Sequence, residues 1–203
     1  MARKRRERGK GGELALKGLG RKDAEASEAA VVSEADGEEF AGAATRGPAT
    51  EEPARREGLQ RARGAYEQGR IEEAIQAYIA VVRLNPADVS VRVEFGDLYD
   101  QIGEHDQAVA QYRAAQQEDP DNTDIMTRLG TAHGASGRCD EAEAELRRAV
   151  RLAPDSLDAR AGLGILFFRK GLYEAADTEL RAVCLRDNEH GPAHFYRGEA
   201  LTR

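Results

Sequence analysis

From about residue 55 onward, hydrophobic positions recur with the spacing of amphipathic helices. Residues 89–101 and 104–117 show this pattern most clearly. The apolar face of the first helix comprises Phe95, Leu98, Tyr99 and, just after the segment, Ile102; that of the second comprises Ala108, Val109, Tyr112 and Ala115. Each segment holds roughly 13 residues, which is about 20 Å of helix. The pattern therefore predicts pairs of short helices, each of which buries one face.

The helix pairs repeat every 34 residues. Four columns of residues keep this period independently, one of proline, one of alanine and two of glycine. They are Pro86, Pro120 and Pro154; Ala74, Ala108, Ala142 and Ala176; Gly69, Gly103, Gly137 and Gly171; and Gly96, Gly130, Gly164 and Gly198. A fixed period of this length is typical of stacked helical units. One pair has too little apolar area to bury alone, so we expect the stacked pairs to share a continuous core.

Each column has a physical role. Gly103 and its equivalents follow the first helix of a pair, where a residue in the left-handed conformation is usually glycine. The prolines end the second helix because proline cannot continue the hydrogen-bond ladder, and Asp121 and Asp155 are expected to help cap the next helix. Gly130 and its equivalents lie inside first helices, where each costs about 1 kcal/mol relative to alanine. We therefore expect these glycines to allow close approach of the paired helix.

Taken together, the columns resemble the tetratricopeptide repeat, and "FGDLYDQIGEHDQAVAQYRAAQQEDP" matches the family pattern closely. The resemblance covers four repeats and a half repeat, at 55–88, 89–122, 123–156, 157–190 and 191–203. It implies an all-α fold, a right-handed α-solenoid of helix-turn-helix repeats, with residues 55–203 as one domain. Arg61, His133 and Asn188 depart from the family pattern without breaking this architecture.

The resemblance also implies a function. Family members hold peptides or helices on a concave face lined mainly by first helices, so we expect a scaffold or adaptor that binds a partner polypeptide. Carried onto this sequence, the groove comprises Leu59, Arg63 and Tyr66; Val93, Asp97 and Asp100; Thr127, Thr131 and Ala135; and Ala161, Ile165 and Phe168. Its N-terminal part is charged and its C-terminal part is apolar. Ile165 and Phe168 are the predicted partner contact; alternatively, they pack beneath the terminal helix 191–203 and belong to the core.

Residues 1–54 lack the periodicity and segregate their charge. Residues 1–22 carry nine Lys and Arg against two Asp and Glu, and residues 23–54 carry one against nine. Such a segment cannot bury enough apolar surface to offset its ordering entropy, so it is predicted to be disordered. Its basic start, which includes Arg3, Lys4, Arg5 and Arg6, is either a solvated tail or an anion-binding arm. The second reading gives an alternative function, a regulatory or anchoring repeat protein that contacts nucleic acid or an anionic surface.

Other classes of function find little support in the sequence. A net charge of −7 argues against general affinity for nucleic acid, and no apolar run is long enough for a transmembrane helix. Cys139 and Cys184 fit no metal or redox spacing, which favours a cytoplasmic location. His190 and His194 have the spacing of metal ligands on a helix, but the Gly-Pro pair between them argues against a continuous helix. We expect no enzyme activity, cofactor or metal, and the remaining alternative is a regulatory repeat region of an enzyme.

Overall fold

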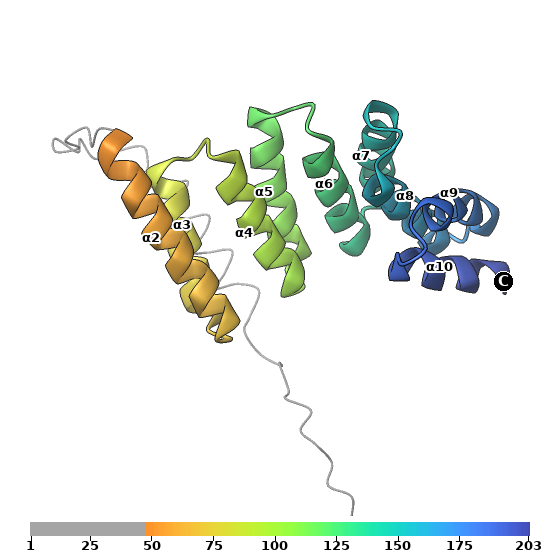
Figure 1. Cartoon of the computed structure of the whole chain (residues 1–203), viewed down its shortest axis with the longest axis horizontal. Helices are drawn as coiled ribbons and strands as arrows, with labels where there is room; N and C mark the ends of the chain where they lie inside the picture. The colour runs from red at the N-terminus through yellow and green to blue at the C-terminus, as the bar shows by residue number, and fades with distance from the viewer. Residues whose placement is uncertain (1–47) are drawn as a thin grey trace, which may run out of the picture. The chain divides into compact units, whose positions relative to one another are not determined.

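The computed structural model describes residues 48–203, with side chains from residue 52 onward. These residues form nine α-helices joined by short turns, with no strand in this range. The helices are α2 (Pro48–Glu67), α3 (Ile71–Leu84), α4 (Val89–Gln101), α5 (His105–Glu118), α6 (Thr123–Ala135), α7 (Cys139–Leu152), α8 (Leu157–Arg169), α9 (Tyr173–Arg186) and α10 (Gly191–Leu201). In Figure 1 they follow one another in chain order, each beside the one before it.

The all-α solenoid of helix-turn-helix repeats expected from the sequence is confirmed. We refer to α2, α4, α6, α8 and α10 as the first helices, and to α3, α5, α7 and α9 as the second helices. α10 is a first helix that no second helix follows before Arg203. α2 begins at Pro48 and continues through Pro53, so this helix starts before the repeat boundary predicted at residue 55. The predicted disorder of the tail concerns residues that lie largely outside the described range.

The turn within each complete repeat depends on a left-handed glycine, as the sequence predicts. Gly69, Gly103, Gly137 and Gly171 have φ values between 72° and 83°. The residue after each glycine closes the turn; for example, the backbone N–H of Arg138 donates to the carbonyl of His133 at 2.9 Å. A side chain would strain the backbone at these positions, because L-residues rarely adopt such φ values.

The helix caps differ from the expectation. The side chains that accept hydrogen bonds from the first turns of α4, α6 and α8 are Asp88, Asn122 and Ser156. Asp121 and Asp155 instead pair with arginines of second helices, Arg148 at 3.0 Å and Arg186 at 2.6 Å. The capping residue lies one position later than predicted, since the turn after the proline needs one more residue before the helix begins.

The buried apolar residues form two main clusters, one over α2–α6 and one over α7–α10, and each cluster spans more than one repeat. Ala74, Ala108, Ala142 and Ala176 are all fully buried. Stacking across a repeat boundary is visible at Tyr78 of α3 and Phe95 of α4, whose ring centroids lie 5.3 Å apart. Each repeat therefore completes its core with side chains from its neighbours.

The glycines inside first helices meet the large side chains of the paired second helices. A Cβ atom added at Gly130 would lie 2.6 Å from Leu146 Cγ and 3.3 Å from the carbonyl oxygen of Ala142. In the same way, a Cβ atom added at Gly96 would lie 2.5 Å from Tyr112 Cε1, and one added at Gly164 would lie 2.6 Å from Leu180 Cγ. The fourth member of the column, Gly198, has no described atom within 4 Å of an added Cβ. The expected close approach is thus present at three of the four positions.

Candidate partner-binding face

The first helices carry the twelve predicted groove residues, and these residues differ in exposure. Leu59, Thr127 and Ala161 are buried, so they contribute to packing inside the solenoid. Thr127 also donates its hydroxyl to the carbonyl of Thr123 at 2.8 Å, within its own helix. The others are exposed or half-buried: Arg63, Tyr66, Val93, Asp97, Asp100, Thr131, Ala135, Ile165 and Phe168. We refer to these nine side chains as the first-helix face.

The N-terminal part of the first-helix face is polar and internally paired. Arg63 of α2 donates two hydrogen bonds to the carboxylate of Glu94 in α4, at 3.1 Å and 2.7 Å. The hydroxyl of Tyr66 donates to Gln101 Oε1 at 2.5 Å. Both contacts join the first repeat to the second, so these side chains already have partners within the protein.

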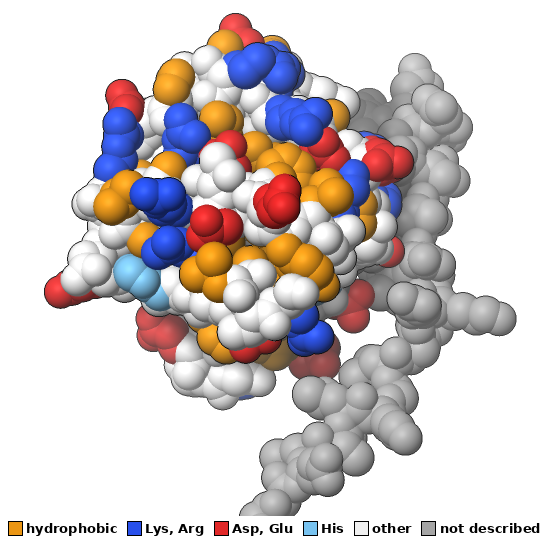
Figure 2. All heavy atoms as spheres, turned by 90° about the vertical axis from the view of Figure 1, so that its right-hand side faces the viewer, with side chains coloured by type: hydrophobic (Ala, Val, Ile, Leu, Met, Phe, Trp, Pro, Cys, Tyr) orange, Lys and Arg blue, Asp and Glu red, His pale blue; other side chains and the backbone are white. Residues whose placement is uncertain are grey.

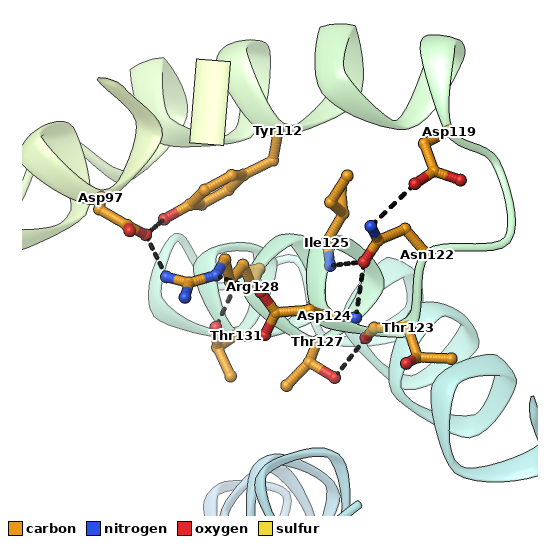
Figure 3. Close-up of polar contacts among 10 residues, drawn as sticks. All are labelled: Asp97, Tyr112, Asp119, Asn122, Thr123, Asp124, Ile125, Thr127, Arg128 and Thr131. Carbon is orange, nitrogen blue, oxygen red and sulfur yellow. Dashed lines mark hydrogen bonds and ion pairs between the residues drawn. The ribbon is translucent and has the colours of Figure 1, made fainter. Parts of the chain in front are cut away.

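Asp97 lies at the centre of a polar cluster that joins α4, α5 and α6 (Figure 3). Its carboxylate accepts hydrogen bonds from the hydroxyl of Tyr112, at 2.6 Å, and from the guanidinium of Arg128. Burial raises the pKa of the Tyr112 phenol, and the hydrogen bond to Asp97 raises it further. Although burial alone lowers the pKa of Arg128, the charges of Asp97 and Asp124 raise it overall. Arg128 is therefore held as a cation between two carboxylates.

Two other polar members of the face bond locally. An oxygen of Asp100 lies 2.7 Å from Nδ1 of His105, across the turn between α4 and α5. The hydroxyl of Thr131 donates to the carbonyl of Arg128 at 2.8 Å, while its side chain remains exposed. Asp100 therefore already has a partner within the protein, and Thr131 carries no charge.

The C-terminal part of the face is apolar and is extended by the terminal helix. The ring centroid of Phe168 lies 5.7 Å from that of Tyr173 and 5.4 Å from that of Tyr196 in α10. The ring centroids of Tyr196 and Phe195 lie 5.2 Å apart, and the Phe195 side chain is 63% exposed. Ile165 is partly buried and, like Phe168, packs against the buried apolar residues of α7–α10. Phe168 thus contacts the terminal helix, as the alternative interpretation holds, but its side chain also remains partly accessible.

The sequence interpretation considered Phe195 only as a residue of the terminal helix that could cover Ile165 and Phe168, and it did not assign Phe195 to the groove. Phe195 occupies the same place in the 34-residue period as Val93, Thr127 and Ala161, which were all assigned to the groove. Extending that column into the half repeat would have identified it. We refer to Ile165, Phe168, Phe195 and Tyr196 together as the apolar end.

The other predicted sites have simpler outcomes. Arg3, Lys4, Arg5 and Arg6 lie outside the described residues. His190 Nδ1 accepts a hydrogen bond from the backbone N–H of Ala193 at 3.2 Å and caps α10, so the Gly-Pro pair begins a helix rather than breaking one. Within residues 48–203, no group of three His, Cys, Asp or Glu side chains has metal-binding geometry. No helix in this range is long and apolar enough to cross a membrane.

Comparison with known proteins supports the repeat architecture. The tetratricopeptide repeat family model matches residues 59–123 and 127–192. No curated protein matches the chain in sequence.

Three solved structures illustrate the similarity of fold. The MamA protein is 21% identical with a TM-score of 0.64, over 73% of this chain and 81% of that one. YrrB, described as a TPR protein with an unusual peptide-binding site, is 21% identical with a TM-score of 0.56, over 71% and 75%. The second TPR domain of human RPAP3, solved with an HSP70 peptide, is 21% identical with a TM-score of 0.52, over 57% and 97%.

Proposed function

Because the chain belongs to the tetratricopeptide repeat family, we propose that it is a protein-interaction scaffold that holds a partner polypeptide on its first-helix face. The observation that carries this proposal is the apolar end, where exposed Phe195 contacts Tyr196 and Tyr196 contacts partly exposed Phe168. An exposed apolar cluster of this kind marks a site that gains free energy when it is covered.

The paired charges support docking at the apolar end rather than at the polar part. A partner that used Arg63 or Asp97 as an anchor would have to replace ion pairs that the protein already makes. Covering a large apolar side chain such as Phe195 needs no such replacement, and it stabilises a complex by roughly 1.5–3 kcal/mol. We therefore expect the partner segment to supply an apolar anchor, and the polar part to set its direction and register.

The known structures favour a peptide as the class of partner. YrrB is described with a peptide-binding site, and the RPAP3 domain was solved with a bound peptide. At 21% identity these structures share the fold with this chain, so the peptide is carried over as part of the proposal.

Selection of peptides on the full-length chain tests the proposal. Random peptides displayed on phage and selected on the immobilised protein should converge on sequences with a large aliphatic or aromatic residue. Their affinity for the Phe195→Ser variant should fall at least tenfold, which corresponds to about 1.4 kcal/mol. The matched control is Leu185→Ser, since Leu185 is 78% exposed on the second helix α9.

The same experiment can refute the proposal. Selected peptides that bind the Phe195→Ser variant as well as the unchanged protein would show that the apolar end is not the docking site. A selection that enriches no peptide would argue against peptide binding itself.

A further inference from the structure

A groove lies between the second helices α7 and α9, over the first helix α8. Its floor is apolar, since Leu163 and Phe167 of α8 are 4% and 6% exposed. The hollow measures about 400 Å³, and its lining residues are Arg147, Val150, Arg151, Leu163, Phe167, Ala175 and Glu179. We refer to these seven residues as the second-helix groove.

Side chains occupy the corresponding place between the earlier second helices. Between α3 and α5, the partly buried side chains of Ile79 and Val82 pack against the apolar core. Between α5 and α7, the amide of Gln116 donates a hydrogen bond to the carboxylate of Glu145 at 3.0 Å. Apolar packing or a side-chain bridge thus occupies this place at both earlier junctions.

Both arrangements are altered between α7 and α9. Val150 stands in the place of Gln116 and has no polar hydrogen to donate, so the bridge that joins α5 to α7 is not formed here. Glu179, in the place of Glu145, accepts instead from Arg160 of its own repeat at 2.9 Å. The two walls of the second-helix groove are therefore not joined as those of the groove before it are.

Ala175 is the second reason why the groove is open. At this place in the 34-residue period α5 carries Gln107 and α7 carries Glu141, whereas α9 carries alanine. A valine that cannot bridge the walls and an alanine that cannot fill the space between them leave a hollow at this junction.

The α7 wall of the groove carries positive charge. Arg147 and Arg151 lie one helical turn apart, and the Arg147 guanidinium lies over the Phe167 ring, 5.7 Å from its centroid. Arg147 is paired with Glu143 at 2.8 Å. Arg151 is exposed, and among the residues that the structure describes it has no hydrogen-bond or ion-pair partner. A ligand can therefore pair with Arg151 without breaking an ion pair of the protein.

We propose that the second-helix groove binds an acidic segment of a partner protein in which an aliphatic residue is flanked by Asp or Glu. The aliphatic side chain enters the hollow above Phe167, and a neighbouring carboxylate pairs with Arg151. A nucleic acid could pair with the arginines, but it would bring no aliphatic side chain to the apolar floor. Figure 2, which faces the end of the molecule that includes α9 and α10, shows Lys and Arg side chains beside exposed hydrophobic ones.

This surface is separate from the first-helix face on which the proposed function rests. The walls of the groove come from second helices, whereas Phe168 and Phe195 belong to the first helices α8 and α10. Phe195→Ser should therefore leave binding at the second-helix groove unchanged.

A synthetic peptide with one leucine between two pairs of glutamates is a suitable probe. Titrated into the isotope-labelled full-length protein at low ionic strength, it should bind with a dissociation constant of roughly 0.1–1 mM, since so small a contact gives weak binding. The NMR shift changes should centre on α7 and α9, and the affinity should fall as salt is added. Peptides with glutamine in place of glutamate, or serine in place of leucine, should each bind about fivefold more weakly.

Three protein variants complete the test. Arg151→Gln should lower the affinity about threefold, as expected for the loss of one exposed ion pair. The matched control is Arg181→Gln, which removes the same charge from an exposed side chain of α9. Arg181 follows Glu179 by two residues, so it lies on the side of α9 away from the groove. Ala175→Gln gives α9 the residue that α5 carries at this place, so it should exclude the leucine and lower the affinity about fivefold while the melting temperature is maintained.

Four results would overturn the proposal. Equal affinities of the Arg151→Gln and Arg181→Gln proteins would show that the peptide responds only to net charge. Shift changes centred on Phe195 would place the peptide on the first-helix face. A single-stranded DNA oligonucleotide that binds more tightly than the peptide, and loses affinity in Arg151→Gln, would make a nucleic acid the occupant. No shift change at several times the expected dissociation constant would mean that the groove does not bind such a segment.

Discussion

The hydroxyl of Tyr112 in the second helix α5 donates a hydrogen bond to the carboxylate of Asp97 in the first helix α4, at 2.6 Å. The same carboxylate accepts from Arg128 of the next repeat. One aspartate on the first-helix face thus joins both helices of its own repeat to the repeat that follows (Figure 3).

Replacing Asp97 should therefore weaken the junction between the second and third repeats. Asp97→Ala leaves a buried phenol and a partly buried guanidinium without their shared acceptor, which typically costs about 1–3 kcal/mol. The urea midpoint of unfolding measures the loss. The control is Asp124→Ala, because Asp124 is well exposed and its pair with Arg128 contributes less than about 1 kcal/mol. Equal midpoints for the two variants would mean that the cluster has no structural role.

Two glycines of the same column should respond oppositely to leucine. Gly130→Leu forces a side chain against Leu146 and the backbone of Ala142, and overpacking of this kind costs about 1–3 kcal/mol or more. Gly198→Leu meets no described atom and replaces a poor helix former, so stability should stay the same or rise by up to about 1 kcal/mol. Thermal unfolding compares the two variants, and hydrogen exchange should place the damage from Gly130→Leu in the third repeat. A Gly130→Leu protein that unfolds at the original temperature would contradict the observed helix contact.

Buried His133 should make stability depend on pH. Its pKa is lowered by burial and by the nearby charges of Arg138 and Arg113, and its Nδ1 has no hydrogen-bond partner among the described residues. The folded state therefore disfavours the proton that the unfolded chain accepts near pH 6.5. Stability should be complete above that pH and should fall as the pH is lowered through it, until the folded protein also takes up the proton.

Comparison of variants isolates the contribution of His133. His133→Phe places an aromatic ring where Phe167 lies one repeat later, and it should reduce the loss of melting temperature between pH 7.5 and pH 5.5. His194→Gln serves as the control, since His194 is exposed. If both variants keep the full pH dependence, groups other than His133 cause it.

The basic start of the chain provides a test of the alternative function. If residues 3–10 act as an anion-binding arm, the full-length protein should bind heparin at low ionic strength and release it as salt is added. Neutralising Arg3, Lys4, Arg5 and Arg6 should weaken this binding. If the affinity of that variant for heparin no longer changes with salt concentration, these four residues account for all of the salt dependence. No binding by the unchanged protein, even at low salt, would eliminate the anchoring alternative.

The sequence alone was sufficient to predict the repeats, the helix pairs and the glycines in the left-handed conformation, such as Gly103. These features depend on residues close together in the chain, because helix periodicity, turn geometry and the limits of proline and glycine act over a few residues. A repeat that contacts only its neighbours carries most of its architecture in one 34-residue period.

Only the tertiary structure decided which residues of one column reach the surface. Leu59 and Phe195 occupy the same place in the 34-residue period, yet Leu59 is 6% exposed and Phe195 is 63% exposed. Gly164 and Gly198 occupy the same place in the period, yet one is covered by Leu180 and the other is open. The physical reason is that exposure depends on the helix packed above each position, and the local pattern at that position does not contain the side chains of the covering helix.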